Sequence, residues 1–232
     1  MIAVNEIRNS VAKFGVTSTV HDLALRTANR LLLLKVFKGF VGERVAPSFL
    51  LCPPPYRRQF LDETMLRAFA LDPNTGLSAG FLDEALSKGD ECYGILDGDG
   101  RLASYGWYAR TPTRIDPPKL RLFFGEHYIY MYKAYTDPRH RGKKLLALAI
   151  TGALKHYQQL GYQGLVAYVE SNNLSSLQSC RQLGYSAFGT IVLIKLFGRF
   201  LILTSAGCRP FGLRIEPVAA DGSDRHHPPA GS

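Results

Sequence analysis

Residues 135–150, YTDPRHRGKKLLALAI, constrain the fold more than any other stretch. A β-rich run passes here through a short basic turn with one glycine into an apolar helical run. A strand, a glycine-containing turn and a helix in direct succession bring backbone N–H groups and the positive end of a helix dipole to one place. The order predicts a mixed α/β or α+β protein with an anion site at the turn, for which a phosphate group is the natural ligand.

Two widespread phosphate-binding motifs do not fit this turn. A Walker motif needs a glycine five residues before a Gly-Lys-Ser/Thr, whereas Asp137 precedes Gly142 and Lys144 replaces the Ser or Thr. The dinucleotide motif GxGxxG fails as well, because Gly142 stands alone. The turn therefore belongs to another kind of phosphate site.

The composition allows one sizeable globular core. Of the 232 residues, 46% are hydrophobic and 20% are charged, which is typical of neither disordered chains nor membrane proteins. The apolar run at 31–34 is far shorter than the ~20 residues that a bilayer span needs. The first twenty residues lack a signal-peptide pattern, and the four cysteines lack metal-ligand spacing. We expect no transmembrane segment, no metal and a cytoplasmic location.

Hydrophobic periodicity and turn residues predict the order of the elements. We expect helices at about 17–30, 62–71, 79–88, 145–161 and 173–184. We expect strands at 33–41, 126–136 and 164–171, and hairpins over 91–110 and 187–205. A proline-rich linker is expected over 51–59 and a loop over 111–119. We divide the chain into an N-terminal helical extension (1–31), a central domain (32–216) and a tail (217–232) that is too polar to bury a core.

Two sequence blocks resemble the GCN5-related N-acetyltransferase (GNAT) superfamily. The family signature Gln/Arg-x-x-Gly-x-Gly/Ala is met by Arg139 and Gly142 and is broken at Lys144. A second block begins at Asn173 and ends with Leu-Gly-Tyr at 183–185, with the spacing that the family shows. The two blocks occur in the expected order, separated by a helix and a strand, and the resemblance extends over about residues 33–204.

The resemblance implies a fold and a ligand. The implied fold is a mixed, mostly antiparallel central sheet flanked by helices, in which the fourth and fifth strands of the family splay apart. The implied ligand is acetyl-CoA, whose diphosphate lies on the turn and whose pantetheine arm runs between the splayed strands. The residues implied in binding it are Tyr135, Thr136, Arg139, Arg141, Gly142, Lys143, Lys144, Leu145 and Asn173.

Acyl transfer to an amine needs a neutral amine, stabilisation of the oxyanion and a proton for the leaving thiolate. Many family members donate this proton from a tyrosine at the position that Cys180 occupies here, so Cys180 or water is the expected donor. The candidate general base is Glu126, which shares a strand face with Tyr128 near the position of the base in some relatives. Tyr128, Tyr130 and Tyr132 form a row that can line the acceptor pocket.

The leading hypothesis is an acetyl-CoA-dependent N-acyltransferase that acts on a small amine or on a peptide or protein amine. A catalytically silent acyl-CoA-binding module is the first alternative. The formal net charge of +9 suggests a second, a basic adaptor that binds membrane or nucleic acid through Arg26, Arg30, Lys35 and Lys38. We expect no nucleic-acid partner and at most weak contact with a membrane surface.

Overall fold

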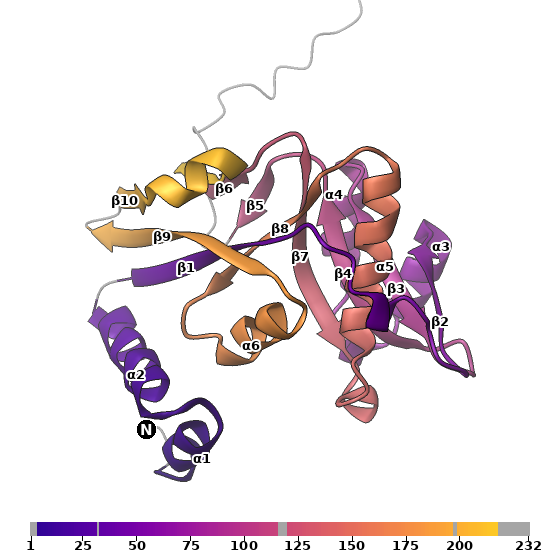
Figure 1. Cartoon of the computed structure of the whole chain (residues 1–232), viewed down its shortest axis with the longest axis horizontal. Helices are drawn as coiled ribbons and strands as arrows, with labels where there is room; N and C mark the ends of the chain where they lie inside the picture. The colour runs from indigo at the N-terminus through magenta and orange to yellow at the C-terminus, as the bar shows by residue number, and fades with distance from the viewer. Residues whose placement is uncertain (1–3, 32, 116–119, 197–198, 218–232) are drawn as a thin grey trace, which may run out of the picture.

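A mixed sheet with eight strands runs through the chain in a computed structural model that describes residues 4–31, 33–115, 120–196 and 199–217 (Figure 1). The strand order is β10-β9-β1-β8-β7-β4-β3-β2, and every neighbouring pair is antiparallel except β7 with β8. The strands are β1 (Leu33–Gly42), β2 (Arg57–Leu61), β3 (Glu91–Leu96), β4 (Leu102–Ala109), β7 (Tyr128–Thr136), β8 (Gly164–Glu170), β9 (Ser186–Leu196) and β10 (Arg199–Thr204). This is the mixed, mostly antiparallel α+β fold that the sequence predicts.

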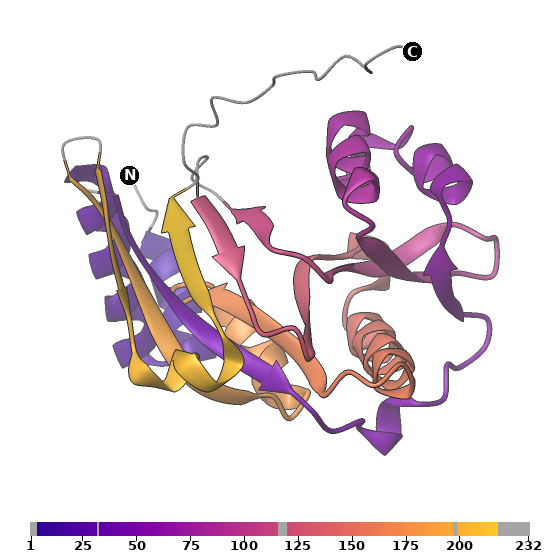
Figure 2. The same ribbon diagram turned by 90° about the horizontal axis from the view of Figure 1, so that it is seen from above.

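The helices divide between the two faces of the sheet (Figure 2). The helices are α1 (Val4–Phe14), α2 (Val16–Leu31), α3 (Glu63–Phe69), α4 (Ala79–Ser87), α5 (Leu145–Gln159) and α6 (Leu174–Gln182), with 3-10 turns η1 (Pro47–Phe49), η2 (Pro73–Thr75), η3 (Pro138–His140) and η4 (Ala206–Phe211). α5 and α6 pack on one face around Ile129 and Leu165, whereas α3 and α4 pack on the other face around Trp107. α2 lies against β1 at the far end of the sheet.

A second, three-stranded sheet covers part of the face opposite α5. It consists of β5 (Thr113–Ile115), β6 (Leu120–Phe123) and β11 (Arg214–Pro217) in the order β11-β6-β5. Leu120, Leu122 and Ile215 bury their side chains against Tyr128 and Tyr130 of the large sheet. The second sheet therefore forms a wall beside β7.

The parallel pairing of β7 with β8 is short. The paired segment begins with Tyr128 opposite Gly164 and ends with Tyr130 opposite Val166. Both strands continue beyond these residues. On its other edge, β7 pairs with β4 through a bulge, because the ladder passes from Ala134 to Tyr132 and skips Lys133, which has φ +33°. A bulge bends a strand away from its neighbour. The separation of these two strands is the splay that the sequence resemblance implies.

Some elements differ from the sequence predictions. α1 lies within the predicted N-terminal helical extension, although no separate helix was predicted before residue 17. β2 lies partly in the segment predicted as a linker. β5 lies within the predicted loop at 111–119, because Thr113 and Ile115 bury their side chains against the second sheet and this burial outweighs the turn signal of the nearby prolines. The predicted tail, apart from Pro217, lies outside the described residues.

Helix α3 supplies a test of the packing. Leu66 of α3 is fully buried, and Leu71, just beyond the helix, is 86% exposed. Leu66→Ala should lower the free energy of unfolding by about 2–5 kcal/mol, because it removes buried apolar atoms and leaves a cavity. Leu71→Ala should change it by less than about 0.5 kcal/mol. Urea denaturation of the two variants checks this, and equal losses would contradict the described burial.

Candidate functional site

Asp137 fixes the beginning of the turn between β7 and α5. Its backbone N–H donates to the carbonyl of Ala103 (2.9 Å), which ties the turn to β4. Its buried carboxylate caps η3 by accepting the backbone N–H of Arg139 (2.8 Å), and it also accepts Nη2 (2.7 Å) and Nε (3.1 Å) of the same residue. Hydrogen bonds from the Arg139 side chain lower the pKa of Asp137 to about 2. Arg139 thus turns back onto Asp137 and stabilises the turn.

A second network fixes the middle of the turn. Lys143 Nζ donates to Tyr56 Oη (2.8 Å), Tyr56 Oη lies 3.0 Å from His140 Nδ1, and His140 Nε2 lies 3.5 Å from Asp97 Oδ2. Lys143 thus donates to Tyr56, whose hydroxyl is hydrogen-bonded to His140, and the other side of the His140 ring faces Asp97. The turn is therefore attached both to the segment before β2 and to the β3–β4 turn.

Two residues of the turn have left-handed backbone conformations. Gly142 has φ +80°, and Lys144, at the N-cap of α5, has φ +59° and ψ +23°. A Cβ at Gly142 would meet nothing within 4 Å, so the conformation rather than space favours glycine there. Lys144 occupies the signature position where the family pattern has Gly or Ala, and it adopts the left-handed conformation there. Its side chain is exposed.

The first turn of α5 presents backbone donors to solvent-accessible space. The first N–H groups of a helix have no partner within the helix, and Lys144 makes no side-chain cap. The helix dipole adds partial positive charge there. Arg141, Lys143 and Lys144 are exposed beside these groups, whereas the Leu145 side chain is buried in the core. The structure thus brings Arg141, Lys143 and Lys144 together around one helix N-terminus.

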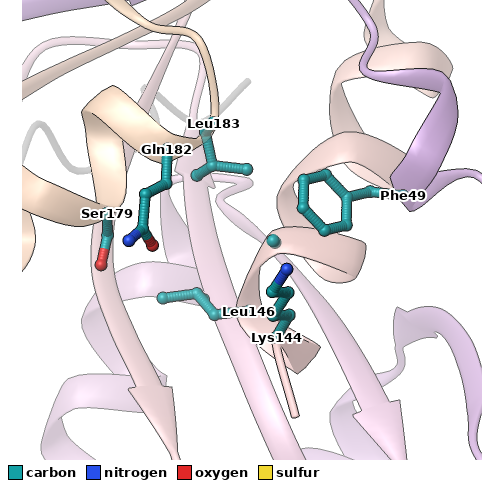
Figure 3. Close-up of a pocket in the computed structure, with 7 residues that line it drawn as sticks. Phe49, Lys144, Leu146, Ser179, Gln182 and Leu183 are labelled. Atoms are coloured by element: carbon teal, nitrogen blue, oxygen red, sulfur yellow. The ribbon is translucent and has the colours of Figure 1, made fainter. Parts of the chain in front are cut away.

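A pocket of about 360 Å³ adjoins this helix end (Figure 3). It lies between the start of α5, the end of α6 and η1, with the Lys144 ammonium 5.9 Å from the ring centre of Phe49. Its lining residues are Phe49, Lys144, Leu146, Ala147, Ser179, Gln182 and Leu183. The pocket combines an apolar wall with a cation at its mouth, which suits an organic group linked to a phosphate.

Tyr135 and Thr136 lie at the end of β7 where β8 has moved away. Both pair with β4 on their other side, and Ser104 Oγ donates to the Tyr135 carbonyl (2.8 Å) and lies 3.0 Å from Thr136 Oγ1. The Tyr135 ring stacks on Tyr105 with 5.4 Å between ring centres. One edge of this strand segment is therefore fixed, and the other faces the gap between β7 and β8.

Asn173 and Cys180 lie on α6. Asn173 is the N-cap, and its Oδ1 accepts the backbone N–H of Ser176 (3.2 Å) and the hydroxyl of Ser175 (3.1 Å). Cys180 is only 5% exposed and packs in the core with Leu177, and burial raises the pKa of its thiol to about 11. The predicted donor position is thus inside the core, and its catalytic role remains a prediction.

Glu126 is not brought to the strand separation. Its side chain is 89% exposed before the start of β7, and Oε1 lies 3.8 Å from His127 Nε2. The strands separate after Tyr130, four residues later, which corresponds to about 13 Å of extended chain. Glu126 was predicted on the strand at 126–136, but it lies in the turn before β7 and so does not share a strand face with Tyr128. The sequence alone does not show where β7 leaves β8.

The described residues include neither a metal-binding cluster nor a helix that could span a membrane. No group of three or more His, Cys, Asp and Glu residues among them is arranged to hold a metal ion. No helix among them is long and apolar enough to cross a bilayer. The candidate site consists of the α5 turn, the adjoining pocket and the opening between β7 and β8.

Comparison with protein families agrees with this geometry. The family model described as Acetyltransferase (GNAT) family matches residues 54–185, more than half of the chain, and includes β7, the turn, α5, β8 and α6. The chain belongs to the GNAT acetyltransferase family. The GNAT resemblance in the sequence is confirmed, and so is the GNAT fold with its separated strands.

This GNAT chain is similar to several solved structures. The GCN5-related N-acetyltransferase from Sphaerobacter thermophilus aligns with TM-score 0.50 and 10% identity, covering 74% of this chain and 55% of that one. A putative acetyltransferase of the GNAT family from Novosphingobium aromaticivorans aligns with TM-score 0.48 and 20% identity, covering 75% of this chain and 67% of that one. The putative acetyltransferase yncA from Salmonella typhimurium, solved with acetyl-CoA, aligns with TM-score 0.41 and 16% identity, covering 72% of this chain and 96% of that one. The chain thus spans only part of the first two proteins. No match was found among curated proteins.

The Asp137 network makes a pH-dependent prediction. Because the folded-state pKa of Asp137 lies below its ordinary value of about 3.9, the carboxylate contributes stability that is fully present above that value and is lost as the pH falls toward about 2. Asp137→Asn should lower the melting temperature by a few degrees at neutral pH. The difference from the parent protein should narrow between pH 4 and pH 2, as measured by thermal denaturation in that range. A difference independent of pH would contradict the role of the charge.

Proposed function

We propose that this chain is an N-acetyltransferase that transfers the acetyl group of acetyl-CoA to a primary amine by direct attack in a ternary complex. Family membership supports acetyltransferase chemistry in general terms. The observation that carries the proposal is the α5 turn, which directs free N–H groups at one point beside the opening between β7 and β8. Acetyl-CoA is the co-substrate that such an arrangement fits, since it joins a diphosphate to a long thin arm.

The described residues fit acetyl-CoA at both ends of that arm. The N–H groups from Gly142 to Leu145 suit the diphosphate, with Arg141, Lys143 and Lys144 as neighbouring cations. The free edge of β7 near Tyr135 and Thr136 can hydrogen-bond the pantetheine amides, and Asn173 retains its side-chain amide N–H groups after capping α6. Arg139 contributes by holding Asp137 and hence η3.

The reaction forms one N–C bond and breaks one C–S bond. The neutral amine attacks the thioester carbon, and backbone N–H groups on the unpaired edge of β7 can stabilise the oxyanion. The bulge at Lys133 leaves an additional residue out of the ladder at this place. The proton lost by the nitrogen and the proton gained by the thiolate balance each other, so water can carry both transfers.

Gly142 provides the test of the co-substrate site. Gly142→Asp should raise the dissociation constant of acetyl-CoA at least about tenfold, because it places a carboxylate beside the diphosphate and strains a left-handed residue. Gly161→Asp is the matched control, since Gly161 ends the same helix with φ +93° and its Cβ would also meet nothing within 4 Å. Calorimetry of both variants decides the matter. Unchanged affinity in Gly142→Asp would remove acetyl-CoA from this turn.

Cys180→Ala tests the proton donor. A thiol with a pKa of about 11 is a weaker acid than an ordinary thiol near 8.5, so proton transfer from Cys180 to the CoA thiolate is uphill. We therefore expect turnover within about twofold of the parent and a loss of about 1 kcal/mol of stability. A loss of about 10²-fold in turnover, with acetyl-CoA binding intact, would instead establish Cys180 as the acid.

A catalytically silent acyl-CoA-binding module is the second candidate. Two observations favour it: Cys180 is buried in the core, and Glu126 is exposed before the start of β7, four residues from the strand separation. The adaptor hypothesis has less support, since Lys35 is paired with Glu170 (2.8 Å). Release of free CoA thiol from acetyl-CoA across a panel of amines distinguishes the enzyme from both alternatives.

A further inference from the structure

A second cavity lies on the sheet face opposite α5 and has no part in the co-substrate site. Its volume is about 400 Å³, and its walls come from α4, from β5 of the second sheet and from β7. Its lining residues are Phe81, Glu84, Ala85, Lys88, Thr113, Arg114, Ile115 and Tyr132. The size falls within the roughly 300–1,000 Å³ that is typical of small-molecule sites.

This cavity adjoins the strand separation through a row of tyrosine rings. Tyr130, the last residue of β7 paired with β8, stacks on Tyr132 with 5.6 Å between ring centres and on Tyr168 of β8 with 5.8 Å. Tyr132 is the next residue on this face and lines the cavity, and the bulge at Lys133 follows it directly. The opening between β7 and β8 therefore begins next to the residue that lines the cavity.

Tyr132 is fixed by a buried carboxylate. Its hydroxyl donates to Asp90 Oδ2 (2.6 Å), and Lys88 Nζ lies 2.9 Å from the same oxygen. The Asp90 side chain is completely buried, and its Oδ1 has no hydrogen-bond partner within the described residues. Burial and the bond to Asp90 hold the pKa of Tyr132 well above its ordinary value, so the phenol stays neutral.

The direction of this hydrogen bond determines what Tyr132 can bind. A phenol has one proton, and here Asp90 receives it, so only the lone pairs of Tyr132 Oη remain for a ligand. A ligand must therefore donate to Tyr132. An amine nitrogen is such a donor, and it keeps one lone pair for attack on a carbonyl carbon.

The opposite wall suits an apolar body. Phe81 is the aromatic residue of this wall, and Lys133 Nζ lies over one face of its ring, 4.2 Å from the ring centre. Phe81 is itself held edge-on by Trp107, with 5.0 Å between ring centres. Ala85 and Ile115 extend the apolar wall, and the rim charges of Glu84 and Arg114 have opposite signs.

We propose that this cavity is the acceptor site, that Tyr132 accepts a hydrogen bond from the acceptor nitrogen, and that the acceptor is a small primary amine with an aromatic or aliphatic body. Asp90 and Lys88 are positioning residues that keep the Tyr132 proton away from the cavity. The inference rests on the proposed acetyltransferase function, and it names the substrate class for that reaction.

The test measures CoA thiol release with 2-phenylethylamine and with a lysine-containing peptide, after calorimetry has established acetyl-CoA binding. We expect turnover of 2-phenylethylamine in preference to the peptide. Tyr132→Phe should raise the KM for 2-phenylethylamine at least about fivefold and leave the KM for acetyl-CoA unchanged. Tyr162→Phe, which removes a hydroxyl on the α5 face, is the control and should change neither value.

A second variant keeps the proposal testable should Tyr132→Phe fail to fold. Phe81→Leu removes an aromatic wall, and it should raise the KM for 2-phenylethylamine at least about threefold relative to the KM for ethylamine.

Failure of acetyl-CoA binding in the parent protein would overturn the proposed function itself. With acetyl-CoA bound, turnover of the peptide alone, or of neither amine, would overturn the acceptor site. An unchanged amine KM in folded Tyr132→Phe would do the same.

Discussion

The parallel pairing of β7 with β8 stops after Tyr130, and both halves of the candidate site depend on this early end. Continued pairing would close the sheet and separate the α5 face from the face of the second sheet. The bulge at Lys133 bends β7, while β4 holds the strand on its other edge through Tyr135 and Thr136. The opening is thus built into a well-paired strand, and its position does not depend on a flexible loop.

The turn after β7 is rigid for a different reason. Asp137 binds Arg139 and the β4 backbone. His140 and Lys143 both hydrogen-bond Tyr56, and His140 also lies beside Asp97. Most of the basic side chains in the turn therefore hold its shape, while the backbone N–H groups of the following helix remain available. A preorganised anion site of this kind loses little conformational entropy when a ligand binds.

The sequence predicts the local parts of the site better than the non-local ones. The order of β7, turn and α5 is local, because apolar periodicity and Gly142 specify it within the 32 residues from Tyr128 to Gln159. Other features depend on which distant segments pack together. They are the burial of Cys180, the distance of Glu126 from the strand separation and the hydrogen bond between Tyr132 and Asp90. β5 was predicted as a loop for the same reason, since its partner β6 is stabilised by β11, almost a hundred residues further along the chain.

The dependence of β5 on β6 and β11 also has a consequence for the order in which the molecule is completed during synthesis. Synthesis up to residue 182 completes the elements around the α5 turn, which are β7, the turn, α5, β8 and α6. β11 is complete only at Pro217. Thr113 and Ile115, which line the cavity beside Tyr132, gain the support of a complete three-stranded sheet only when Ile215 has left the ribosome and paired with Leu122. The elements around the α5 turn are therefore synthesised before the wall of the cavity on the opposite face is finished.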